Sequence, residues 1–182
     1  MLRSRLLSAR ASRSQDERVA AGGALARHGA PAWTGLTTVA AYAAFGTEPP
    51  TRPLLDALTD AGVRVLLPIV DGDDVDWGGY EGWDRLVPHG RLGLLEPAGT
   101  RLGPAALRAV DVIVVPALAV DRAGHRLGRG AGHYDRALAA TAVPRVAVVY
   151  DDEVLDTIPS EAHDVLMGDA LCPSGFVPLG GG

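Results

Sequence analysis

Three apolar runs, separated by segments with helical spacing, constrain the fold of this chain most strongly. The runs cover Val63–Val70, Val110–Val120 and Arg145–Tyr150. Within the second run, Val112–Val115 is apolar without alternation, which is typical of a strand buried on both faces of a sheet. Strands that alternate with helices along a chain favour parallel pairing. We therefore predict an α/β domain with a mainly parallel sheet.

The remaining periodicities predict the other elements. Leu2–His28 is predicted as a helix, with a candidate break at Ser12–Ser14 and Gly29 as its end. Leu36–Phe45 is predicted as a further buried strand. The other expected elements are helices over Arg52–Ala61, Pro104–Ala109 and Tyr134–Ala142, and loops with short strands over Asp71–Gly103.

Composition narrows the classes of function. The chain has 182 residues and a formal net charge of -5, which argues against binding nucleic acid through bulk charge. All 17 basic residues are arginine, so a lysine Schiff base and a P-loop lysine are excluded. Cys172 is the single cysteine and cannot form an internal disulfide. With no signal-peptide core and no apolar stretch of transmembrane length, we expect one cytoplasmic domain over 1–182 and no membrane partner.

A glycine-rich segment follows the second apolar run. Val114–Leu138 reads VVPALAVDRAGHRLGRGAGHYDRAL, with glycines at 124, 128, 130 and 132 ahead of a predicted helix. Glycine lets the backbone approach an anion closely, and a helix N-terminus offers free N–H groups. Arg126 and Arg129 add guanidinium groups, which bind phosphate through two N–H donors. The segment is a candidate phosphate cradle, although glycine spacing alone is equally compatible with a turn-rich connection and solvated arginines.

The complete string RLGRGAGHYDR, residues 126–136, resembles the signature of the 5-formyltetrahydrofolate cyclo-ligase family, which typically reads RLGxGxGYYDR. Other segments resemble the family in the same chain order. They are Leu2-Arg3 with the Arg-rich first helix, AYAAFGTEPPTRPL at 41–54, LLPIVDGD at 66–73, GLLEP at 93–97 and His163-Asp164-Val165. The resemblance therefore covers nearly the whole chain.

This resemblance implies a compact three-layer α/β/α domain, acting as a monomer. It implies an enzyme that uses ATP and Mg²⁺ to convert 5-formyltetrahydrofolate, with or without a polyglutamyl tail, to 5,10-methenyltetrahydrofolate, ADP and phosphate. In the implied reaction the formyl oxygen attacks the γ-phosphate, N10 of the folate adds to the formyl carbon, and phosphate leaves. The protein then mainly positions two substrates and balances phosphate charge.

The resemblance also implies roles for individual positions. Arg129 and Glu48 are the implied catalytic residues, and a carboxylate such as that of Glu48 can hydrogen-bond the N–H-rich edge of a pterin. Asp135 and Asp164 are the implied magnesium ligands, because one or two carboxylates suffice for this ion. The implied ATP-binding residues are Arg3, Arg126, Leu127, Gly128, Arg129, Gly130, Ala131, Gly132, His133 and Tyr134. The implied folate-binding residues are Ala43, Glu48, Arg129, Gly130, Ala131, Gly132 and His133.

Several of these side chains have a structural role as the competing interpretation. Tyr134 is equally compatible with stacking on a substrate ring and with core packing. Asp135 is also placed to interact with a helix dipole, and Arg3 to be a solvated helix charge. Three aromatic residues are candidates for a folate-side wall, for which packing is the favoured interpretation: Trp77, Tyr80 and Trp83.

The sequence departs from the family pattern in three places. A family lysine four residues before Arg3 would precede Met1, Ala131 stands where relatives carry glycine or lysine, and His133 replaces the first tyrosine of a pair. A histidine there adds a source of pH dependence. These departures keep open a relative that binds folate or nucleotide without catalysis. Two further alternatives are disfavoured: an RNA-binding protein on the same fold by the acidic balance, and a kinase-like phosphotransferase by the absence of a Walker or kinase motif.

Overall fold

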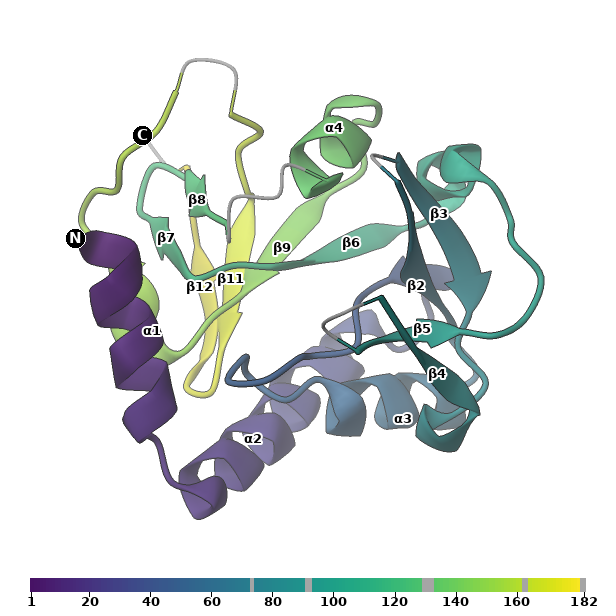
Figure 1. Ribbon diagram of the computed structural model, residues 1–182, viewed down its shortest axis with the longest axis horizontal. Helices are drawn as coiled ribbons and strands as arrows, with labels where there is room; N and C mark the ends of the chain where they lie inside the picture. Colours follow the sequence, from purple (N-terminus) through teal and green to yellow (C-terminus); the bar gives the residue numbers. More distant parts are fainter. Residues whose placement is uncertain (73, 91–92, 129–132, 162–163, 181–182) are drawn as a thin grey trace.

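The computed structural model describes residues 1–72, 74–90, 93–128, 133–161 and 164–180 (Figure 1). A seven-stranded sheet crosses its centre in the order β12-β11-β9-β6-β1-β2-β3, and two smaller sheets have the orders β10-β7-β8 and β4-β5. The helical elements are α1 (Leu2–Ser12), α2 (Gln15–Trp33), α3 (Arg52–Asp60), η1 (Trp83–Arg85), η2 (Pro104–Ala109), α4 (His133–Ala139) and η3 (Asp151–Glu153). The strands are β1 (Thr38–Ala40), β2 (Arg64–Asp71), β3 (Asp74–Gly79), β4 (Leu86–His89), β5 (Leu94–Pro97), β6 (Val112–Pro116), β7 (Ala119–Asp121), β8 (Arg126–Leu127), β9 (Arg145–Val148), β10 (Val154–Leu155), β11 (Asp169–Cys172) and β12 (Gly175–Pro178).

The strands at the centre of the large sheet are parallel. β1 pairs in parallel with β2 and β6, β6 with β9, and β9 with β11. Both edges are antiparallel, where β3 pairs with β2 and β12 pairs with β11. This arrangement confirms the prediction of an α/β domain with a mainly parallel sheet.

The strand β6 shows why the domain has three layers. Val112 and Val114 pack in one buried cluster, with Leu54 of α3 and with residues of α2. Ile113 and Val115 pack in another, with Leu138 of α4 and with η2. Because successive side chains of a strand point to opposite faces, an unbroken apolar run needs cover on both. Figure 1 shows α2 and α3 on one side of the sheet and α4 on the other.

The predicted first helix is divided in two, and its predicted end is wrong. A break separates α1 from α2 in the region indicated by the sequence, and Ser14 caps α2 by accepting the N–H of Glu17. The helix then continues through Gly29 to Trp33. A Cβ at Gly29 would lie 2.8 Å from Cδ1 of Leu54 and 3.0 Å from Cδ2 of Leu171. Glycine at this position therefore permits close packing of α2 on α3 and β11, and does not end the helix.

The long predicted strands are shorter than expected, because the chain leaves the sheet. The run over Val110–Val120 forms β6 and then β7, which belongs to the small sheet, where the Leu118 N–H donates to the Leu127 carbonyl at 2.7 Å. Likewise Leu36–Phe45 contributes only β1 before it becomes a loop.

The two later helices also differ from their predicted form. Pro104–Ala109 is a 3-10 helix, and the predicted helix at Tyr134 begins one residue earlier and ends at Ala139. None of the described helices is both long and apolar enough to cross a bilayer.

Candidate functional site

The order of the parallel strands changes direction between β1 and β6. The chain goes from β1 through α3 to β2 on one side, and from β6 through α4 to β9 on the other. The connections that follow β1 and β6 therefore lead to opposite sides. In open α/β sheets, ligands bind at the carboxyl ends of the two strands where the connections separate in this way. The loop after β1 and the connection after β6 are therefore the segments to inspect.

The loop after β1 contains Glu48 and is held by short-range hydrogen bonds. Thr51 is completely buried, and its hydroxyl donates to the Tyr42 carbonyl at 2.7 Å and accepts the Ala44 N–H at 2.9 Å. One carboxylate oxygen of Glu48, Oε2, accepts the Phe45 N–H at 2.8 Å. Both predicted folate-binding residues of this region, Ala43 and Glu48, thus lie in one ordered loop.

One tyrosine stands in each of the two segments: Tyr42, buried, in this loop, and Tyr134, partly buried, in the first turn of α4. Neither the Tyr42 hydroxyl nor the Tyr134 hydroxyl has a hydrogen-bond partner among the described residues. Burial raises the pKa of both phenols, and the charge of Glu48 raises each further. Both groups are therefore neutral, and among the described residues their O–H donors have no acceptor.

The connection after β6 brings Arg126 and Asp135 together. The Arg126 side chain is 6% exposed, its Nη2 forms an ion pair with Oδ1 of Asp135, and its Nη1 donates to the Pro116 carbonyl at 3.4 Å. A Cβ on Gly128 would lie 2.9 Å from Nη1 of Arg126, so glycine leaves room for this guanidinium. Leu127 is buried against β7 and α1. Its side chain therefore packs in the protein, and its carbonyl accepts the Leu118 N–H.

The N-terminal helix reaches the same connection. Nε of Arg3 donates to the Gly128 carbonyl at 3.3 Å, across 125 residues of sequence. Two predicted ATP-binding positions that are remote in the chain thus contact each other. Arg129, Gly130, Ala131 and Gly132 lie outside the described residues, as does the side chain of His133.

The two predicted magnesium ligands approach this region from different segments. Asp135 is about half exposed, at 51%. Asp164 accepts the Glu161 N–H at 2.7 Å through Oδ2, and three residues later the Met167 N–H donates to the Gly124 carbonyl at 2.8 Å. Gly124 has φ +95, and a Cβ there would lie 2.6 Å from the Met167 carbonyl oxygen. Among the described residues, no three His, Cys, Asp or Glu side chains form a cluster that could hold a metal.

Two buried acids in this region received no role from the sequence. Asp121 accepts the His125 N–H at 2.9 Å and the Ile158 N–H at 3.3 Å, so it holds the turn ahead of Arg126. Burial opposes ionisation of Asp121, but the hydrogen bonds from His125 and Ile158 outweigh it and lower the pKa of this carboxyl. Glu153 forms a buried ion pair with Arg10. Arg10 lies on the same face of α1 as Leu6. An arginine on the apolar face of a helix is the sequence signal that could have indicated its ion pair with Glu153.

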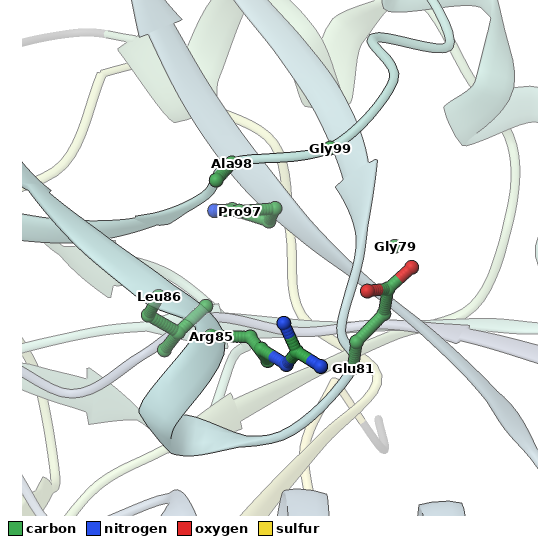
Figure 2. Close-up of a pocket in the computed structure, with 7 residues that line it drawn as sticks. All are labelled: Gly79, Glu81, Arg85, Leu86, Pro97, Ala98 and Gly99. Atoms are coloured by element: carbon green, nitrogen blue, oxygen red, sulfur yellow. The ribbon is translucent and has the colours of Figure 1, made fainter.

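A small pocket of about 270 Å³ opens beside the β4–β5 hairpin (Figure 2). Glu81 and Arg85 line one side of it, and Pro97 and Ala98 lie opposite. Leu86, also in its wall, packs on the same core cluster as Ala43. The three aromatics considered for a folate wall pack within the protein: Trp77 is 1% exposed, the Tyr80 hydroxyl donates to Asp56, and Trp83 lies beneath Arg52.

Comparison with known proteins gives consistent matches. The family model for the 5-formyltetrahydrofolate cyclo-ligase family matches residues 1–173. The 5-formyltetrahydrofolate cyclo-ligase of Mycolicibacterium smegmatis is 47% identical over 151 residues, which cover 78% of this chain and 77% of that protein. The protein of the same name from Escherichia coli K12 is 32% identical over 143 residues, covering 75% and 78%. The structure of Aquifex aeolicus 5,10-methenyltetrahydrofolate synthetase has a TM-score of 0.79 and 28% identity, covering 100% of this chain and 92% of that chain.

Proposed function

Because this chain belongs to the 5-formyltetrahydrofolate cyclo-ligase family, we propose that it converts 5-formyltetrahydrofolate to 5,10-methenyltetrahydrofolate with ATP and Mg²⁺. The formyl oxygen forms a bond to the γ-phosphorus, and the bond from that phosphorus to the ADP oxygen breaks. N10 of the folate then adds to the formyl carbon and loses its proton. Cleavage of the carbon–oxygen bond releases phosphate, so that the products are the ring-closed folate, ADP and phosphate.

The observation that carries this proposal is the convergence of two segments at the carboxyl ends of β1 and β6. The loop after β1 supplies Glu48, and the connection after β6 supplies Arg126, Tyr134 and Asp135. An enzyme that joins a folate to a phosphate must hold two ligands in contact, and orientation of this kind accounts for a large part of such catalysis. The charge of Glu48 raises the pKa of Tyr134, which supports one shared site for both substrates.

We assign separate tasks to the two segments. Glu48 accepts the Phe45 N–H through Oε2, and we propose that its carboxylate also orients the pterin. Ala43 and the Tyr42 hydroxyl border the same ligand. Arg3, the backbone at Gly128 and Tyr134 are proposed to contact ATP, together with the motif residues from Arg129 to His133. Arg126 is held by Asp135 and the Pro116 carbonyl, so we propose that it orders the segment as well as meeting phosphate.

We propose Asp135 and Asp164 as the protein ligands of a magnesium ion. Among the described residues, Asp135 uses Oδ1 for Arg126 and Asp164 uses Oδ2 for the Glu161 N–H. Magnesium keeps several waters and binds through one or two carboxylates plus substrate phosphates, so a cluster of three protein ligands is not required. Bound there, the ion would offset the charge that develops on the transferring phosphoryl group.

The broader expectations remain proposals. We propose that residues 1–182 form one domain, and this is supported by a family match that extends over residues 1–173 and by the contact of α1 with Gly128. A monomeric state, a cytoplasmic location and acceptance of polyglutamylated folates are likewise implied by the family resemblance. None of these changes the chemistry proposed for the site.

A direct assay tests the function. The protein is mixed with 5-formyltetrahydrofolate, ATP and magnesium, and both the methenyl chromophore and ADP are followed in time. We expect equimolar formation of the two products, with dependence on all three additions. Folded protein that binds ATP and folate but releases no ADP would instead be a binding relative without catalysis. Product formation without ATP would remove the phosphorylation step.

A further inference from the structure

Helix α1 buries an arginine where an apolar residue would be expected. Its buried residues are Leu6 and Arg10, and Arg10 is 0% exposed. Nε and Nη2 of Arg10 donate to Oε1 and Oε2 of Glu153 at 2.7 and 2.8 Å, and Nη2 also donates to the Ala117 carbonyl at 2.6 Å. Glu153 is 2% exposed. Removing two charges from water is costly, and apolar residues of similar size are often as stable, so such a pair is best explained by the geometry it specifies.

The contacts of this pair join α1 to two strand ends. Ala117 directly follows β6, and Oε2 of Glu153 also accepts the N–H of Tyr150, which follows β9 at a distance of two residues. The fork of an arginine fixes direction as well as distance, because both of its N–H donors must meet both carboxylate oxygens. Arg10 therefore fixes where α1 lies along the carboxyl edge of the sheet and how it is rotated.

Three residues of α1 form one stripe along this contact. Arg3, Leu6 and Arg10 are spaced i, i+3 and i+7, which places them on the same face, with Arg3 about 10.5 Å from Arg10 along the axis. Leu6 packs in a cluster with Leu118 and Leu127, while Arg3 donates to the Gly128 carbonyl. The stripe thus contacts the chain where it enters the β7–β8 hairpin and where it leaves it. Figure 1 shows α1 alongside β7 and β8.

The register of α1 is its position along the sheet edge together with its rotation about its own axis. The contacts of Arg3, Leu6 and Arg10 do not contribute equally to it. Packing of Leu6 is non-directional and tolerates a small shift or roll of the helix. The Arg3 contact is a single exposed hydrogen bond of 3.3 Å, which is too weak to hold a helix. The bidentate pair of Arg10 is the buried and directional one. A shift of α1 by one residue would move Arg3 by about 1.5 Å and rotate it away from Gly128.

We infer that Arg10, through Glu153 and the Ala117 carbonyl, is a positioning residue that sets the register of α1 and so places Arg3 at Gly128, on the nucleotide side of the site. The inference rests on the proposed function, because that function assigns Arg3 and Gly128 to ATP. It adds a residue that touches neither substrate, and it explains why a helix at the start of the chain is tied to the ends of β6 and β9.

The test compares ATP with folate in a set of variants. Arg10→Met combined with Glu153→Gln removes both buried charges and leaves an acceptor for the Tyr150 N–H. We expect the KM for ATP, and the Kd for ATP measured by calorimetry, to rise about tenfold, the factor that loss of one charge-assisted hydrogen bond represents. The KM for 5-formyltetrahydrofolate should stay within about twofold, since local contacts hold the Glu48 loop. A merely structural role would change both constants, or neither.

A second set of variants tests whether Arg10 acts on ATP binding through Arg3. In an Arg3→Ala background the paired substitution should raise the ATP constants no further, because the contact it positions is already gone. Additive effects, or equal changes for both substrates, would overturn the inference. If the paired variant fails to fold, Arg10→Lys is used, which keeps the charge but loses the bidentate guanidinium. It must raise the KM and Kd for ATP by a smaller factor and leave the KM for folate unchanged.

The chain offers a matched control in a second ion pair between the same two segments. Arg13 follows α1 and pairs with Asp152 of η3, but the Asp152 side chain is 62% exposed. Arg13→Met with Asp152→Asn should leave both KM values unchanged, and an ATP-selective loss there would count against Arg10 as the register residue. Failure of the proposed function would look different: wild-type protein would bind ATP without forming product, and the ATP constants would still decide the role of Arg10.

Discussion

The loop after β1 and the segment from Gly124 to Gly128 lie at neighbouring strand ends, yet contacts of different range hold them. Thr51, Tyr42 and Ala44 bond within ten residues of one another, and Glu48 bonds to Phe45. The 124–128 segment has local bonds to Asp121 as well, but it also bonds to partners far away in the chain, at Arg3 and Met167. The folate side should therefore respond to changes in its own loop, and the nucleotide side to changes elsewhere.

The largest effect is expected on the folate side. Glu48→Ala removes a carboxylate that we assign to the pterin, and loss of a charged hydrogen bond of roughly 1.5–3 kcal/mol corresponds to about tenfold to a hundredfold in catalytic efficiency. The measurement is kcat/KM for 5-formyltetrahydrofolate, together with the Kd for ATP. Glu48→Gln keeps an acceptor for the Phe45 N–H and should restore thermal stability but not efficiency. Full activity of the glutamine variant would show that Glu48 only stabilises its loop and that its charge does not contribute to folate binding.

A smaller loss is expected on the nucleotide side, at the two carboxylates proposed to hold the metal. Asp135→Asn keeps size and hydrogen bonding but removes charge, so more magnesium should be needed for half activity and the maximal rate should fall on the order of tenfold. Asp164→Asn should act in the same direction more mildly, because water can replace one ligand of a hydrated ion. Activity is measured against magnesium at fixed ATP, with Asp156→Asn as an exposed control. Unchanged magnesium curves for both variants would place the metal elsewhere.

The turn ahead of Arg126 should show a dependence on pH. Asp121→Asn replaces a buried acceptor of several N–H groups and should lower the free energy of unfolding at pH 7 by about 1–3 kcal/mol. Hydrogen bonds lower the pKa of Asp121 in the folded protein, so its stabilisation is present above the unfolded pKa of about 3.9 and is lost as the pH falls through the folded pKa.

The check is urea unfolding of wild type and the Asp121→Asn variant from pH 7 downward. Their difference in stability should be full at pH 7 and should narrow below about pH 4. A gap that stays constant over this range would mean that the charge of Asp121 contributes nothing to the turn. Asp156→Asn, whose side chain is 99% exposed, serves as the control for loss of one acid.

The smallest effect is expected for the hydrogen bonds of Thr51. It tests whether the loop after β1 is held independently of the nucleotide side. Thr51→Val removes the hydroxyl that bridges Tyr42 and Ala44, and a neutral hydrogen bond contributes about 1 kcal/mol. We expect a few-fold rise in the KM for folate with the KM for ATP unchanged. Thr59→Val is the matched control, since its hydroxyl bonds only to Leu55 within α3. An equal rise in both KM values would show that the two sides are not held independently.

The segments that form the candidate site were predictable from the sequence because motif positions are local. The string from Arg126 to Arg136 indicated the connection after β6, and Glu48 was expected in a loop that follows a buried strand. Glu48 lies in a loop after β1, and the described part of the string follows β6, while the roles of these residues stay predictions. The ion pair of Arg126 with Asp135 and the packing of Leu127 were not expected, because the motif states which residues are present and not which way their side chains turn.

The failures of prediction have the same cause. Gly29 was expected to end a helix, since glycine is poor at continuing one. In the structure it lies where Leu54 and Leu171 leave no space for a side chain, which is a property of three segments at once. The run at Val110–Val120 was expected as one strand, because apolar periodicity cannot indicate that its second half pairs in another sheet.

The amino-acid order by itself determined the α/β class, the parallel strands and the segment that carries the family signature, because period, propensity and turn chemistry act between residues close in the chain. Only the tertiary structure decided that Arg10 meets Glu153, 143 residues away, and that Arg3 meets Gly128. Such contacts depend on which elements pack together, and many pairings of charged residues are compatible with one sequence. Burial selects among them, since a charge taken out of water must find a partner with the right geometry.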